Sequence, residues 1–144
     1  MPTRTARTAW NGSLKEGSGQ VELSSSKIGT YEVSFPKRAA EDAGGTTSPE
    51  ELIAAAHSAC FAMALSNEIG QAGGTPVALD VRADVTLGQK DGGLAITTSA
   101  ITVRGEVQGL DAAAFQEAAE RAKAGCPVSK ALAGVDISLD ATLE

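Results

Sequence analysis

Residues 48–66 have the sequence SPEELIAAAHSACFAMALS, and this stretch predicts the helix around which the fold is built. Ser48 can cap the free backbone N–H groups at the start of a helix, and Pro49 is favoured at the first helical position. Glu50 and Glu51 complement the positive end of the helix dipole. Ser48 and Glu51 also have the spacing of a capping box, so these residues mark a strong helix start.

We expect this helix to run to about Ile69 or Gln71, where the glycines that follow end it. The helix is apolar on nearly every face, so we expect it to be buried on nearly every side. His57 and Cys60 are unusual in so apolar a helix. They lie three positions apart and therefore share one face.

The segment before the helix has the pattern of short strands and turns. Candidate strands cover residues 5–10, 21–23 and 27–35, and Pro36 ends the last of them. A polar loop over residues 37–47 then leads to the helix.

The segment after the helix alternates between strands and helices. Apolar residues at every second position of 79–87 predict a strand with one wet face. The elements that follow are a turn at 91–93, a strand over 94–107, a helix that opens at 110–111 and breaks at 125, a helical turn over 126–133 and a strand over 135–143. This order predicts one α+β domain over residues 1–144, with a largely antiparallel sheet.

The composition is that of a globular protein with a core of small side chains. Of the 144 residues, 42% are hydrophobic but only 3% are aromatic, so Ala, Val, Leu and Ile must supply the core. Because small side chains bury little area each, an additional buried interface, such as a dimer, is more plausible than usual.

The charge pattern and the apolar stretches disfavour nucleic acids and membranes as partners. The formal net charge is −6 and no basic patch stands out, which disfavours nucleic-acid binding. The first residues lack the apolar core of a signal peptide. The longest apolar stretch, 52–65, is broken by His57 and Ser58 and is too short to span a bilayer. We therefore expect a cytoplasmic protein that makes no membrane contact.

The chain has two cysteines, Cys60 and Cys126, and no CxxC motif. A reducing compartment disfavours a constitutive disulfide, but two thiols 66 positions apart can still meet in the fold and form a transient redox disulfide. Cys60 by itself is most simply a small buried hydrophobe. Cys126 precedes Pro127 at an expected helix N-cap, where free N–H groups stabilise a thiolate. Its local surroundings therefore make Cys126 the more reactive thiol. A purely structural role, as a helix cap that packs in the core, is also consistent with its position.

A metal site is an alternative use of the same residues. His57, Cys60 and Cys126 could converge on zinc, but a structural site needs a fourth ligand and the chain has no second histidine. A non-catalytic metal-binding or ligand-binding domain therefore stays open, and so does His57 as a hydrogen-bonded polar group in the core.

Glu50 and Arg38 have ordinary explanations as a helix-start acid and a surface charge in the preceding loop. A role for Glu50 at the Cys60 thiol is limited by the distance between the two residues. Ten residues of continuous helix span ~15 Å, so Glu50 cannot touch Cys60 of its own chain. If Glu50 serves the Cys60 thiol, it does so from the helix of a partner across a dimer interface.

Two motifs make the chain resemble a known family. TSPEELIAAAHSACFAMALS at 47–66 and KAGCPVS at 123–129 are similar to the OsmC/Ohr family of thiol peroxidases, and the resemblance covers nearly the whole chain. The AAAH that precedes SACF, together with the FPKR loop at 35–38, is more similar to the OsmC branch than to the Ohr branch.

The resemblance implies a mechanism and a site. Cys60 matches the peroxidatic cysteine, Cys126 the resolving cysteine, and Arg38 and Glu50 the catalytic arginine and glutamate. The implied substrate is an organic hydroperoxide, the implied reductant is a lipoyl-type dithiol, and no cofactor or metal is required. A peroxide sensor that oxidises once is an alternative. Since a mid-helix Cys60 gains little from its own dipole, its activation would have to come from Arg38 and the surrounding charges.

The family also implies a fold. It is an intertwined homodimer in which antiparallel sheets wrap around long central helices, with the active site at the subunit interface. This implication agrees with the distance between Glu50 and Cys60 along the helix.

Overall fold

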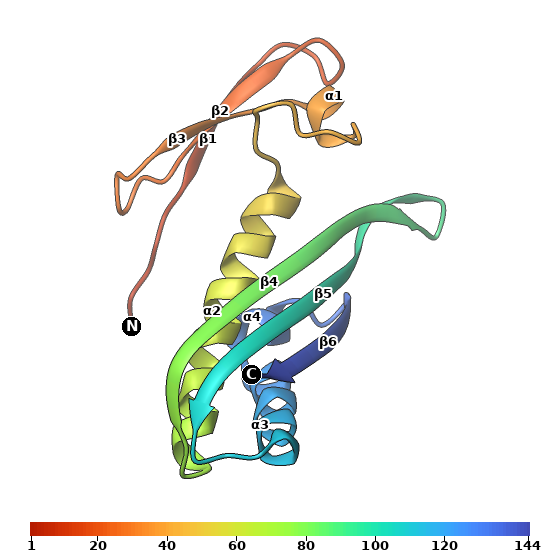
Figure 1. The fold of residues 1–144 in the computed structure, drawn as a ribbon. Helices are drawn as coiled ribbons and strands as arrows, with labels where there is room; N and C mark the ends of the chain where they lie inside the picture. Colours follow the sequence, from red (N-terminus) through yellow and green to blue (C-terminus); the bar gives the residue numbers. More distant parts are fainter. The chain divides into compact units, whose positions relative to one another are not determined.

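The computed structural model describes all residues, 1–144, and has the elements of an α+β protein (Figure 1). The elements are β1 (Arg7–Asn11), β2 (Ser18–Glu22), β3 (Thr30–Val33), α1 (Phe35–Arg38), α2 (Pro49–Gln71), β4 (Thr75–Lys90), β5 (Gly93–Gln108), α3 (Ala112–Gly125), α4 (Pro127–Ala131) and β6 (Asp136–Leu143). The chain falls into two compact units, Met1–Leu52 and Ile53–Glu144, and each is described by itself.

The first unit is a three-stranded antiparallel sheet in the order β1-β2-β3. Three strands are present, as predicted, but β2 begins three residues before the expected 21–23 and β3 is shorter than the expected 27–35. The expectation that Pro36 ends a strand and opens a loop is wrong in detail. The Ser34 Oγ accepts the backbone N–H of Lys37 at 3.3 Å, so Pro36 lies in the first turn of the short helix α1. Arg38 therefore ends a helical turn instead of lying in a loop.

The sheet of the second unit has the order β4-β5-β6. The strands β4 and β5 form a long antiparallel hairpin that closes where Lys90 pairs with Gly93. Asp91 and Gly92 have φ angles of 53° and 81°, as a tight hairpin turn of the mirror-image type requires. The last strand, β6, pairs in parallel with β5, so the sheet is largely but not wholly antiparallel.

The long helix α2 begins and ends where the sequence predicts. The Ser48 Oγ accepts the N–H of Glu51 at 3.1 Å, and the helix runs for 23 residues to Gln71. One face of α2 is buried at a spacing of four residues, through His57, Phe61, Leu65 and Ile69.

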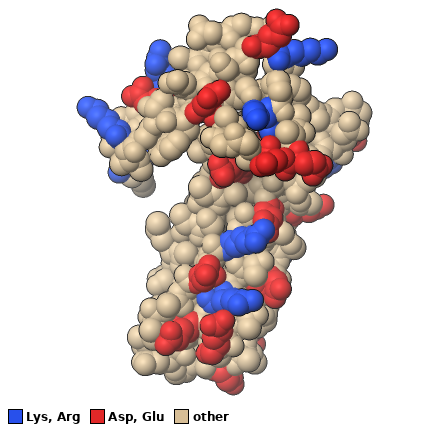
Figure 2. All heavy atoms as spheres, turned by 45° about the horizontal axis from the view of Figure 1, so that its top comes forward, with Lys and Arg blue, Asp and Glu red and all other residues tan.

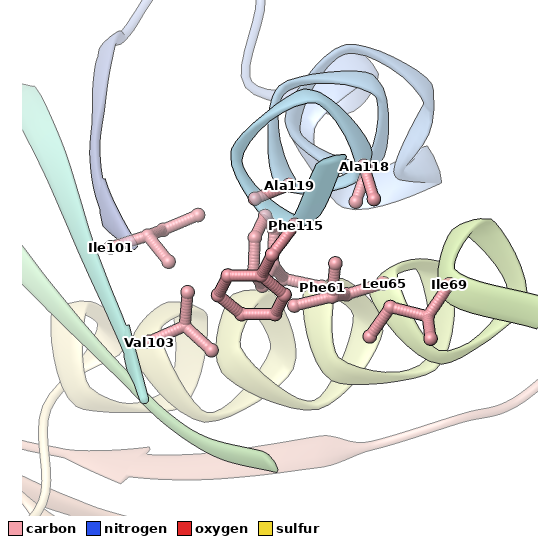
Figure 3. Close-up of a cluster of buried hydrophobic side chains, with 9 residues drawn as sticks. Phe61, Leu65, Ile69, Ile101, Val103, Phe115, Ala118 and Ala119 are labelled. Carbon is pink, nitrogen blue, oxygen red and sulfur yellow. The ribbon is translucent and has the colours of Figure 1, made fainter. Parts of the chain in front are cut away.

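The core of the second unit lies between α2, α3 and β5 (Figure 3). Its buried members are Phe61, Leu65, Ile69, Ile101, Val103, Phe115, Ala118, Ala119 and Ala122. Small alanines on α3 let this helix approach closely. On β5, a Cβ atom at Gly105 would lie 2.6 Å from the Phe115 ring, so only glycine allows the ring to pack against the strand there.

The expectation that α2 is buried on nearly every side is wrong for the single chain. Met63 is 72% exposed, and Ala55, Ala56 and Ala59 are exposed as well. Only 22% of the most apolar 18-residue window of α2 is buried in the chain. The helix therefore carries an apolar face, Ala55–Ala56–Ala59–Met63, that the chain itself does not cover.

The full length of α2 also corrects the prediction, made from the apolar stretch 52–65, that this segment is too short to span a bilayer. With 23 residues, α2 is long and apolar enough, by length and composition alone, to cross a membrane. The core helix of a soluble protein passes the same test, and α2 contributes four side chains to the interior of the second unit. The absence of membrane contact remains a prediction.

Charged side chains of both signs are interspersed on the face shown in Figure 2. On that face no broad basic patch gathers of the kind that follows a nucleic-acid backbone.

Candidate active site

The two thiols, 66 positions apart in sequence, meet in the second unit. Cys60 lies on α2 directly before the buried Phe61, and Cys126 lies at the junction of α3 and α4. Their Sγ atoms are 2.9 Å apart and share a hydrogen bond, and both cysteines are free thiols. Cys126 is fully buried, whereas Cys60 is partly exposed. The pair is thus reachable from the Cys60 side.

The backbone fixes Cys126 firmly. Its N–H donates to the carbonyl of Ala122 at 2.9 Å, and its carbonyl accepts the N–H of Lys130 at 3.1 Å. The residue therefore ends α3 and starts α4 at once, as the predicted N-cap position requires. Its side chain makes no capping hydrogen bond, which leaves the sulfur available to Cys60.

The two thiols differ in acidity. Burial raises the pKa of Cys60 above its ordinary value, and the hydrogen bond with Cys126 raises it further. Burial also acts to raise the pKa of Cys126, but the hydrogen bond with Cys60 and interactions with Ser129 and Val128 outweigh it and lower that pKa. In the single chain Cys126 therefore forms a thiolate more readily than Cys60, in agreement with the prediction made from its position at a helix N-cap.

Arg38 and Glu50 meet in the first unit. The Arg38 Nη2 lies 2.8 Å from Glu50 Oε1, and its Nε donates to both carboxylate oxygens, at 2.9 and 3.2 Å. Glu50 is only 7% exposed, whereas the guanidinium keeps part of its surface open. This forked geometry holds the guanidinium in one orientation and leaves N–H groups for another partner.

A small cavity of about 140 Å³ lies beside Arg38 in the first unit. Its walls are mostly apolar and consist of Trp10, Leu14, Val33, Ser34, Phe35, Arg38 and Pro49. The arrangement places a cation at the edge of an apolar space.

His57 is fully buried and both of its ring nitrogens are hydrogen-bonded. Its Nδ1 lies 2.7 Å from Ser99 Oγ, and its Nε2 lies 2.8 Å from Ser129 Oγ. Burial lowers the pKa of His57, so the ring is neutral at neutral pH. Since neither nitrogen is free to bind a metal, the metal-site alternative loses its only histidine. No group of three or more His, Cys, Asp or Glu side chains is arranged to hold a metal ion.

The sequence reasoning missed Ser99 and Ser129. Ser129 could have been predicted from the sequence, because it lies three residues after Cys126 in the second motif and in the first turn of the same short helix. Ser99 lies in the middle of β5, and no pattern in that strand marks it as a partner of His57.

Comparison with known proteins identifies the family. A family model described as OsmC-like protein matches residues 41–140. The chain belongs to the OsmC-like family. It is 44% identical to peroxiredoxin OsmC of Escherichia coli K12 over 135 residues, which covers 94% of this chain and 92% of that protein. It is 32% identical to the organic hydroperoxide resistance protein of Xanthomonas axonopodis over 119 residues, which covers 81% and 82%.

Solved structures of organic hydroperoxide resistance proteins have the same fold. The organic hydroperoxide resistance protein of Elizabethkingia anophelis superposes with a TM-score of 0.79 at 28% identity, covering 100% of this chain and 98% of that one. OhrB of Bacillus subtilis gives 0.75 at 28% identity, covering 96% and 98%. The predicted OsmC/Ohr membership and the α+β fold class are confirmed, and the higher identity to peroxiredoxin OsmC agrees with the predicted OsmC branch.

Proposed function

We propose that this protein is a cysteine-based peroxidase that reduces organic hydroperoxides, and hydrogen peroxide more weakly, to alcohols or water. The observation that carries the proposal is the distance of 2.9 Å between the sulfurs of Cys60 and Cys126. In an OsmC-like chain whose relatives are named peroxiredoxin and organic hydroperoxide resistance protein, this distance suits a redox pair. The protein is then an oxidoreductase of antioxidant and stress defence.

The reaction proceeds in three steps. The Cys60 thiolate attacks one peroxide oxygen, so an S–O bond forms, the O–O bond breaks and the alcohol leaves. Cys126 then attacks the Cys60 sulfenic acid, a disulfide forms and water leaves, which protects Cys60 from further oxidation. A dithiol reductant of the lipoyl type restores both thiols by exchange. No metal or organic cofactor takes part.

Arg38 supplies the positive charge that the Cys60 thiolate needs nearby. Because burial raises the pKa of the Cys60 thiol, the thiolate needs a cation nearby to form at neutral pH. Glu50 orients the guanidinium through the forked ion pair, and Arg38 then stabilises the thiolate and aligns the peroxide. The apolar cavity beside Arg38 favours an organic substituent over hydrogen peroxide.

The Arg38–Glu50 pair that serves Cys60 comes from the other subunit of a homodimer. Glu50 and Cys60 of one chain are separated by ~15 Å of continuous helix, which no side chain spans. The exposed apolar face of α2 around Met63 supports burial against a second copy. The chain acts as one domain over residues 1–144 in an intertwined dimer, with the active site at the interface, in the reducing cytoplasm.

The test is intact-mass analysis of the reduced protein after one equivalent of cumene hydroperoxide, followed by peptide mapping. A loss of two hydrogens mapped to Cys60–Cys126 is the expected result. With a dithiol reductant present, many equivalents should be consumed, which separates an enzyme from a sensor that oxidises once. Unchanged thiols, or oxidation of Cys126 alone, would contradict the proposal.

Variants of the two cysteines separate the steps. Cys60→Ser should abolish peroxide consumption, because the attacking sulfur is gone. Cys126→Ser should still reduce about one equivalent but fail to form the disulfide that the dithiol recycles. Retained turnover in Cys60→Ser, or normal recycling in Cys126→Ser, would show that the roles are assigned wrongly.

A further inference from the structure

A line of buried polar side chains runs from β5 to the resolving cysteine. It consists of Ser99 on β5, His57 on α2 and Ser129 on α4, and Ser129 lies in the first turn of the helix that Cys126 caps. His57 and Ser99 are fully buried and Ser129 is 7% exposed, so bulk water does not supply their hydrogen bonds. Every polar group in this line has a partner within the protein.

Ser129 is the residue that joins His57 to the thiol. It lies three positions after Cys126 in the first turn of α4, and its Oγ is 2.8 Å from His57 Nε2. After the hydrogen bond with Cys60, interactions with Ser129 lower the pKa of the Cys126 thiol. When the hydroxyl hydrogen points at the sulfur, the lone pairs of the Ser129 Oγ remain free to accept a hydrogen bond from His57.

We propose that His57 is a positioning residue that acts through Ser129 to hold the Cys126 thiol ready as the resolving nucleophile. In this arrangement the neutral ring accepts the Ser99 hydroxyl hydrogen at Nδ1 and donates its Nε2–H to Ser129 Oγ. The Ser129 hydroxyl hydrogen is then directed at the Cys126 sulfur. The inference rests on the proposed function, because resolution is a step of that reaction.

The step that benefits is the attack of Cys126 on oxidised Cys60. The Cys126 thiol loses its proton, the S–S bond forms and the S–O bond of the sulfenic acid breaks. The departing hydroxide takes a proton and leaves as water, so the Cys126 sulfur is oxidised and the Cys60 sulfur is reduced. His57 and Ser129 are unchanged at the end, and their part is to favour the thiolate that attacks.

No charged side chain competes with this arrangement. The acidity of Cys126 is set by burial, Cys60, Ser129 and Val128, and that of His57 is set by burial alone. The titratable groups in the line are thus the two thiols and the imidazole. A change in the pKa of Cys126 after removal of a serine hydroxyl can therefore be assigned to the hydrogen bond that was lost.

The test follows the ionisation of Cys126 by itself. In full-length Cys60→Ser protein, the ultraviolet absorbance of the thiolate is titrated against pH, with Ser129→Ala or Ser99→Ala added separately. The two serines form a matched pair, since each removes one hydroxyl from one ring nitrogen of the same buried histidine. We expect Ser129→Ala to raise the pKa of Cys126 by about one pH unit, because a hydrogen bond to an anion is lost.

The control separates positioning from a merely structural role. Ser99→Ala should lower thermal stability about as much as Ser129→Ala does. It should leave the pKa of Cys126 unchanged. His57→Gln keeps an N–H donor toward Ser129 and should behave like the parent, whereas His57→Leu should behave like Ser129→Ala. An unchanged midpoint in Ser129→Ala, or an equal shift in Ser99→Ala, would overturn the proposal even if His57→Leu failed to fold.

A second readout uses the chain with both cysteines. After one equivalent of cumene hydroperoxide, acid quenching and intact mass follow sulfenic acid and disulfide separately. Ser129→Ala should slow disulfide formation about tenfold and leave sulfenic acid formation unchanged. The absorbance titration needs no peroxide, so it decides the role of His57 even if the parent protein failed to reduce peroxides.

Discussion

At the scale of single residues, the geometry of the Arg38–Glu50 ion pair leads to a test of catalysis. Three contacts between 2.8 and 3.2 Å fix the guanidinium, and a lysine cannot reproduce this fork. We expect Arg38→Lys to lower kcat/KM for cumene hydroperoxide about tenfold or more, because the proposed charged hydrogen bond to the Cys60 thiolate depends on the orientation that the fork gives. Stopped-flow consumption of peroxide measures the effect.

The chain offers a matched control for this substitution. Arg82 makes an equally forked pair with Asp84, at 2.8 to 3.1 Å, but both side chains are largely exposed. Arg82→Lys should leave kcat/KM within about twofold, since exposed ion pairs contribute little. Equal losses in the two variants would mean that Arg38 supports only the fold.

His57 gives a prediction for the pH dependence of stability. Burial lowers its pKa below the ordinary value of 6.5, so the unfolded chain binds a proton there that the folded chain does not. Stability from this residue is complete above pH 6.5 and is lost as the pH falls below that value. Urea unfolding at pH 7 and pH 5 should show a smaller acid-side loss in His57→Gln than in the parent. The carboxylates titrate equally in both proteins, so a parallel loss would show that His57 makes no such contribution.

At the scale of elements, local chemistry decides which parts of the fold can be predicted. The start of α2 and the β4–β5 hairpin follow from a capping serine and from Asp91-Gly92, whose effects act within a few residues. The parallel pairing of β6 with β5 depends on which strands meet after α3 and α4, and alternation of side chains alone does not encode it. The uncovered face of α2 was mispredicted because hydropathy reports a preference for burial and not which chain provides it.

Gly105 tests how closely α3 packs on β5. A methyl group at this position would meet the Phe115 ring at 2.6 Å and displace α3 or the strand. We expect Gly105→Ala to lower the free energy of unfolding by about 1–3 kcal/mol, as overpacking does. Gly70 in α2 is the control, because its added methyl meets nothing within 4 Å. Gly70→Ala should stabilise by roughly 0.5–1 kcal/mol, and equal effects in the two urea titrations would contradict the packing argument.

At the scale of the whole molecule, the sequence motifs identified four candidate residues, and the structure brings them together as two pairs, one in each compact unit. The distance along α2 was derivable from the helix rise alone, because ten residues of helix have a fixed length. The support that His57 and Ser129 give to Cys126 was not derivable, since it depends on how α2, α4 and β5 meet.

The proposed shared site can be tested by mixing two inactive proteins. Cys60→Ser retains Arg38 and Glu50, and Arg38→Ala retains both cysteines. If each site takes Cys60 from one subunit and Arg38 from the other, a mixed dimer has one complete site and one empty one. Random reassociation makes half of the dimers mixed, so we expect about a quarter of the parental activity from a symmetric dimer. The mixture is unfolded and refolded together, with each variant refolded alone as the control. Activity no higher than the sum of the two controls would mean that Arg38 serves the Cys60 of its own chain, and the interface site would then be wrong even if the protein is a dimer.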